Sequence, residues 1–156
     1  MSGDFKMIYA PNLIALLIDA RTERDFTGRL LHLYAQEAVP FNGGTDMVIQ
    51  LDDLYDTWKY PQRATSQRHF KENKTGPGQR AATHLNDRDR VRTIEELYEA
   101  RGKMATFMLQ VEYRQNSSWQ GHVIWLEKGE TRSFQSVLEL MRMMDRALRD
   151  LTEDAS

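Results

Sequence analysis

Apolar and polar residues alternate along two neighbouring stretches in the last third of the chain. From Phe107 to Arg114, and again from Trp119 to Leu126, apolar side chains recur at every second position. A period of two places them on one face of a β-strand. Lys128-Gly129 then predicts a tight turn, because glycine accepts the positive φ that such turns need. Residues Thr131 to Phe134 predict a short third strand.

The spacing changes to a helical one after Phe134. Ser136 and Glu139 are placed as in a capping box. The apolar residues that follow recur at intervals of three and four, which puts them on one helical face. They are Val137, Leu140, Met141, Met144, Leu148 and Leu151, with Arg142, Asp145, Arg146 and Arg149 on the other face.

The first third of the chain shows the same pattern 93 residues earlier. Residues 16–56 align with 109–149 without a gap. The identical pairs are Leu16/Leu109, Arg21/Arg114, Gly28/Gly121, Leu33/Leu126, Glu37/Glu130, Phe41/Phe134 and Asp52/Asp145. By analogy we predict strands at about 13–21, 26–34 and 37–41. A helix with Thr45 as its N-cap follows them, and we interpret the pattern as a duplication.

The predicted fold is a single α+β domain over residues 1–156, built from a tandem pseudo-repeat of antiparallel strands plus one helix (β-β-(β)-α twice). The first unit covers 13–58 and a connector covers 59–92. The last part, 93–151, holds a short helix and the second unit. Thr93 and Glu96 form the capping box of that helix, which we expect to end near Arg101. The two units can pair edge to edge or back to back, and the same logic allows a homodimer.

Charge is distributed unevenly although the net charge is only −2. The connector carries nine Lys or Arg against three Asp or Glu, so the rest of the chain is acidic. A basic stretch near aromatic residues is suited to nucleic acid. Folding back onto the acidic helices explains it equally well. The candidate contacts are Arg63, Arg68, Lys71, Arg80, Arg88 and Arg90.

Two arginines occupy matching positions in the predicted first strands, each two residues after an acid. Because alternate residues share a strand face, Asp19 with Arg21 and Glu112 with Arg114 should project opposite the main apolar set. One interpretation is a duplicated anion site in which the acids hold the arginines. The other is a pair of surface ion pairs of little energetic value. Gln115, Asn116 and His122 complete this candidate contact face.

Several function classes find no support in the residues. There are no cysteines, and the four histidines lack metal-ligand spacing, so we expect no metal and no cofactor. No nucleophile elbow or phosphate loop is present, so we expect no enzyme. The longest apolar stretch near the N-terminus is too short to span a bilayer, which favours a cytoplasmic protein. The aromatic residues Phe26, Trp119, Trp125 and Phe134 favour a packed core over a base-stacking surface.

The run from Tyr113 to Gly121, together with Trp125 and the helix over 134–148, resembles a family of short bacterial proteins of unknown function. The resemblance implies a compact bacterial or phage-type protein and supplies no activity. The element order is similar to Whirly-type single-stranded-DNA-binding proteins, which have four strands per copy where three are predicted here. It is also similar to the double-stranded-RNA-binding domain. Residues 135–140 lack the lysines which that domain carries, so its function does not transfer.

These observations lead to three functional expectations. The first is a non-enzymatic binding protein, an adaptor or inhibitor acting on a macromolecular partner, most simply a protein. The second is nucleic-acid binding through the basic connector. The third is capture of a small anionic ligand such as a nucleotide between the units, through Arg21 and Arg114.

Overall fold

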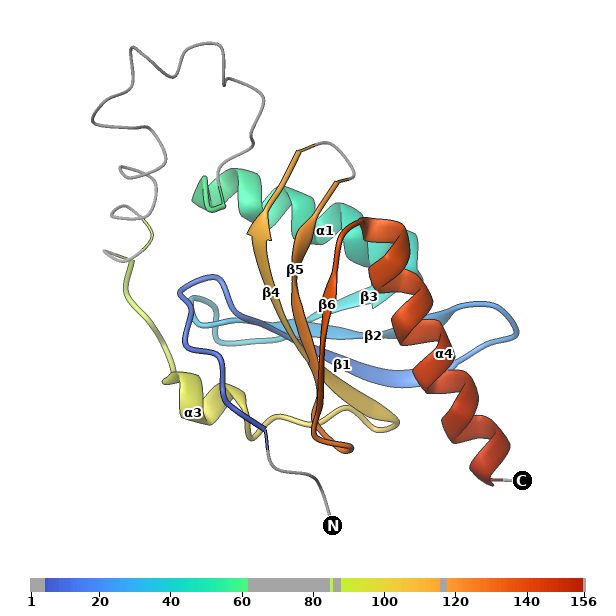
Figure 1. Cartoon of the computed structure of the whole chain (residues 1–156). Helices are drawn as coiled ribbons and strands as arrows, with labels where there is room; N and C mark the ends of the chain where they lie inside the picture. The colour runs from blue at the N-terminus through green and yellow to red at the C-terminus, as the bar shows by residue number, and fades with distance from the viewer. Residues whose placement is uncertain (1–4, 62–84, 86–87, 116–117, 156) are drawn as a thin grey trace.

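Six strands form one antiparallel sheet with the order β3-β2-β1-β4-β5-β6, as the computed structural model shows (Figure 1). The structure describes residues 5–61, 85, 88–115 and 118–155. The strands are β1 (Ile14–Arg21), β2 (Phe26–Leu31), β3 (Val39–Asn42), β4 (Ala105–Tyr113), β5 (Gln120–Trp125) and β6 (Glu130–Phe134). The α+β class agrees with the prediction, and β1 pairs with β4 in the centre of the sheet.

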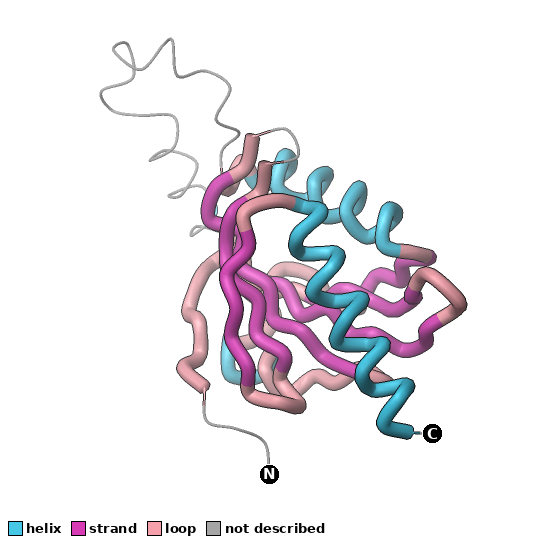
Figure 2. The backbone as a smooth tube through the Cα atoms, turned by 45° about the vertical axis from the view of Figure 1, so that its right-hand side comes forward, coloured by secondary structure: helices cyan, strands magenta, loops and turns pink. Residues whose placement is uncertain are grey.

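Two long helices, α1 (Gly44–Trp58) and α4 (Val137–Ala155), pack on one face of the sheet (Figure 2). Their buried side chains share a core with alternate residues of β1 and β4. The opposite face is covered by the N-terminal segment and by the short helix α3 (Ile94–Leu97). The sheet is therefore the middle layer, and its central strands are buried on both sides, which explains the continuous apolar run in β1.

Helix starts match the sequence signals in two cases and differ in the third. Thr93 and Glu96 form the predicted capping box of α3, and the Glu139 amide of α4 donates to the Ser136 hydroxyl at 3.0 Å. The prediction that Thr45 caps α1 is wrong, because the cap is Gly43 at φ 109°. The carboxylate of Asp25, between β1 and β2, accepts from the Gly44 amide at 2.8 Å. It supplies the acceptor that Gly43 lacks.

The strand ladders of the two halves have the same registers at an offset of 93 residues. Leu17 lies opposite Arg29 in β1–β2, and Gln110 lies opposite His122 in β4–β5. The β2–β3 and β5–β6 ladders match in the same way, with Phe41 opposite Gly28 and Phe134 opposite Gly121. A β-carbon on Gly28 would stand 2.1 Å from the Leu17 carbonyl oxygen. One on Gly121 would stand 1.9 Å from that of Gln110, so both ladders need glycine at this point.

A β-bulge interrupts each first strand and corrects one prediction. The register shifts between Ile18 and Ala20 in β1, and between Val111 and Tyr113 in β4. One extra residue moves every later side chain to the other face of a strand. Arg21 therefore lies across from Phe26, on the face that the helices cover. The prediction that Arg21 and Arg114 project away from the main apolar set is wrong for this reason.

Candidate functional site

The two matched arginines each bind the helix of the other half of the molecule. Arg114 at the end of β4 pairs with Asp52 of α1 at 2.6 Å and with Asp56 at 2.9 Å. Arg21 at the end of β1 pairs with Asp145 of α4 at 3.4 Å. The sequence showed these residue types at matching positions but could not show the exchange, which arises because β1 and β4 pair antiparallel in the centre of the sheet.

The Arg114 guanidinium is enclosed by protein groups. Its side chain is 1 % exposed, it donates to the Pro61 carbonyl oxygen, and it lies 5.6 Å from the centre of the Tyr55 ring. Burial raises the pKa of the Tyr55 hydroxyl. Arg21 and Arg114 also stand at opposite ends of the antiparallel β1–β4 pair. They do not converge on one pocket, so the structure does not form the predicted twin-arginine site for a small anion.

The acids expected to hold these arginines have other partners. Asp19 forms two hydrogen bonds with Arg29, at 2.8 and 2.9 Å, and these hydrogen bonds hold the pKa of the Asp19 carboxyl below its usual range. Glu112 lies 3.5 Å from the imidazole of His122 on the surface. Gln115 accepts a hydrogen bond from the Tyr113 hydroxyl. These are local contacts, between β1 and β2 for Asp19 and around the β4–β5 hairpin for Glu112 and Gln115.

The basic connector is described only at its ends. Arg63, Arg68, Lys71, Arg80 and the hairpin residue Asn116 lie outside the described residues. Arg88 is half-buried and Arg90 is exposed. Arg92 donates to the carbonyl oxygens of His32, Ala35 and Gln36, which ties the end of the connector to the first half. Nucleic-acid binding by the connector stays a prediction.

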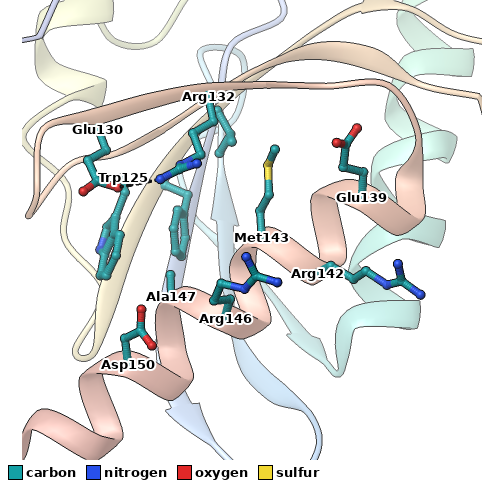
Figure 3. Close-up of a pocket in the computed structure, with 11 residues that line it drawn as sticks. Trp125, Glu130, Arg132, Glu139, Arg142, Met143, Arg146, Ala147 and Asp150 are labelled. Atoms are coloured by element: carbon teal, nitrogen blue, oxygen red, sulfur yellow. Dashed lines mark ion pairs between the residues drawn. The ribbon is translucent and has the colours of Figure 1, made fainter.

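A groove that the sequence did not reveal runs between α4 and the strands β4, β5 and β6 (Figure 3). We call it the α4 groove, and its volume is about 390 Å³, within the range of ligand pockets. Its lining includes Trp125, Met143, Arg132, Arg142 and Arg146. Figure 3 shows Trp125 across the groove from α4, with Arg132 and Arg146 reaching in from opposite sides. In the sequence, the only indication of this groove was Trp125, an aromatic residue whose matching position in the first half is His32.

The carboxylates at the groove rim are partly committed. Glu130 pairs with Arg132 at 3.6 Å, and Glu139 accepts from the backbone amide of Gln135 at 2.7 Å. Among the residues that the structure describes, no carboxylate forms an ion pair with Arg142 or Arg146. Both arginines also line a second hollow of about 440 Å³ on the other side of α4, together with Arg24.

The core prediction for the aromatic residues is confirmed for three of four. Phe26, Trp119 and Phe134 are buried beneath the helices, whereas Trp125 is half-buried in the groove. Its ring centre lies 6.0 Å from that of Phe107 and 5.6 Å from the Lys128 ammonium. The buried indole N–H of Trp125 has no acceptor among the described residues.

Among the residues that the structure describes, no group of His, Asp and Glu side chains could hold a metal ion. No helix in that part of the chain is long and apolar enough to cross a bilayer. No known family model, curated protein or solved structure matches this chain.

Proposed function

We propose that this chain is a non-enzymatic binding protein, an adaptor or inhibitor that docks a partner protein in the α4 groove. One observation carries the proposal. The groove is open, its inner wall is Trp125 and Met143, and its rim holds three arginines. Tryptophan, methionine and arginine are the residues enriched at protein interfaces. The flexible methionine can adapt to the partner's shape.

The environment of the titratable groups supports binding over catalysis. A general acid or base needs access to a cleft. His32 is instead packed beneath Trp58 and Tyr34. Of the groove carboxylates, Glu130 and Glu139 are engaged as described above, and Asp150 is exposed to solvent. The groove is therefore better suited to contact a partner protein than to supply a catalytic acid or base.

Site-specific photo-crosslinking tests the proposal. A photoreactive amino acid replaces Met143 in the groove, and the matched control carries it at Gln50, which stands 93 positions earlier on α1. In nuclease-treated lysate of the source cells, the Met143 probe should capture one protein at least about tenfold more strongly than the Gln50 probe. Equal capture at the two positions, or none at Met143, would contradict the proposed function.

We also propose that the two halves are copies of one ancestral unit, β-β-β-α. Support comes from the shared registers, the paired bulges at Asp19 and Glu112, and the glycines at 28 and 121. The exchanged ion pairs of Arg21 and Arg114 add to it. An experimental structure in which backbone atoms 93 residues apart fail to superpose over the six strands would refute this origin.

A further inference from the structure

Two arginines on the solvent-facing side of α4 form no ion pair within the described part of the chain. Arg142 and Arg146 are exposed and one turn apart, so they lie side by side on the helix. Arg24 joins them around the second hollow. Asp145 is held by Arg21 and Arg149, and Asp25 by two backbone amides. Within the described part of the chain, the three arginines therefore have no ion pair to break before they bind an anion.

The α4 groove beside Arg142 and Arg146 is better suited to a peptide than to a nucleic acid. A base that stacked on Trp125 would have to displace the Lys128 ammonium from the ring. Five carboxylates line the two hollows beside the arginines and would repel a continuous phosphate backbone. They are Asp25, Glu130, Glu139, Asp145 and Asp150. A peptide can instead place single carboxylates at the arginines and an apolar side chain against Trp125 and Met143.

We propose that the α4 groove binds an acidic segment of a partner protein, with carboxylates at Arg142 and Arg146 and an apolar side chain against Trp125 and Met143. This inference rests on the proposed function and names the chemistry of the partner. Arginine forms planar two-point hydrogen bonds with a carboxylate, so the pair on α4 favours Asp and Glu at a defined spacing. Recognition through this pair should weaken as salt rises.

Selection from a phage-displayed library of random 12-residue peptides tests the inference on the full chain. The selected peptides should be rich in Asp and Glu and contain one large apolar residue. Arg142→Glu or Arg146→Glu should weaken binding of these peptides at least about tenfold, by like-charge repulsion at the contact. Both residues are exposed on a helix, and a circular dichroism melt checks that each variant folds.

Lys6→Glu is the matched control. It makes the same change in net charge at an exposed residue of the N-terminal segment, which packs on the opposite face of the sheet. It should leave peptide binding within about twofold, because a charge farther away than the Debye length of about 10 Å is screened. An equal loss in Lys6→Glu would mean that overall charge, and not the groove, governs binding, and would overturn the inference.

Four further outcomes distinguish a failure of this inference from a failure of the proposed function. Selection of basic or neutral peptides overturns the acidic-peptide inference. The inference is also overturned if a single-stranded dT 20-mer binds more tightly than any peptide and Arg146→Glu abolishes that binding. If Met143 still crosslinks a protein while Arg142→Glu and Arg146→Glu capture it as well as the unmodified chain, only this inference fails. If Met143 crosslinks nothing, the proposed function fails with it.

Discussion

The two halves of the sheet have the same strand registers. They differ in the side chains that pack between the end of each long helix and the sheet. In the first half, Trp58 at the end of α1 is 2 % exposed and packs edge-on against His32 and Tyr34. In the second half, Leu151 stands 93 positions later and is half-buried, while Trp125 occupies the position that matches His32. The large aromatic side chain stands on the helix in the first half and on the strand in the second, where the space beside α4 is open.

The difference shows which contacts the fold requires and which it leaves free. Registers depend on backbone approach at Gly28 and Gly121, where a side chain would strike a carbonyl oxygen. The helix end has no such restriction, because one large side chain can be exchanged for a smaller one if solvent or a partner fills the space. The second half therefore has the same registers as the first and, in addition, an open surface beside α4.

Truncating the side chain at the end of each long helix should show the largest difference in stability between the two halves. Trp58→Ala should lower the free energy of unfolding by about 4 kcal/mol, the usual cost of removing a buried tryptophan. Leu151→Ala should lower it by only about 1 kcal/mol, because that side chain is only partly buried against the core. Urea unfolding measures both. Similar losses of stability in the two variants would mean that both helix ends are equally buried, and would contradict the comparison.

Acid should destabilise the protein chiefly through the first half. Burial, with Arg92 and Arg88 nearby, lowers the pKa of His32 to about 4. An unfolded histidine titrates near 6.5, so the unfolded chain binds more protons between the two values and stability falls as pH drops through this window. His32 alone should remove about 3 kcal/mol between pH 7 and pH 4.

The His32→Asn variant isolates that contribution, since an Asn oxygen can replace the imidazole nitrogen that accepts from the Tyr34 amide. Unfolding free energies of the two proteins, measured in urea from pH 7 to pH 4, should converge as the pH falls. Parallel curves would show that His32 does not titrate in this range. Further loss below pH 4 is expected from Asp19 and Asp145, whose pKa values are lowered by arginine partners.

The exchanged ion pairs should show the smallest contrast. Arg114→Met removes a guanidinium that is 1 % exposed and should cost about 2 kcal/mol, less than a wholly buried pair because Asp52 and Asp56 remain in contact with water. Arg21→Met removes a single longer contact and should cost about 0.5 kcal/mol. Thermal melts at matched pH and salt measure both losses. A larger loss of stability in Arg21→Met than in Arg114→Met would contradict the prediction that the buried ion pair contributes more.

Much of the fold could be predicted because it depends on local patterns. Alternation predicted the strands, and capping residues at Thr93 and Ser136 predicted two helix starts. The start of α1 could not be predicted, because its acceptor comes from Asp25 across a turn. The candidate site was also missed, since Trp125 and Met143 are 18 positions apart and nothing local shows that the space between them stays open.

The sequence by itself determined the strands, the order of the elements and the matching of residues 93 apart, because side-chain period and glycine placement act through the backbone nearby. Only the tertiary structure decided that the bulges turn Arg21 and Arg114 onto the helix-covered face and that each arginine binds the helix of the other half. It also decided that the space beside α4 stays open. Those outcomes depend on contacts between residues distant in the chain, which form only when β1 pairs with β4 and both helices settle on one face.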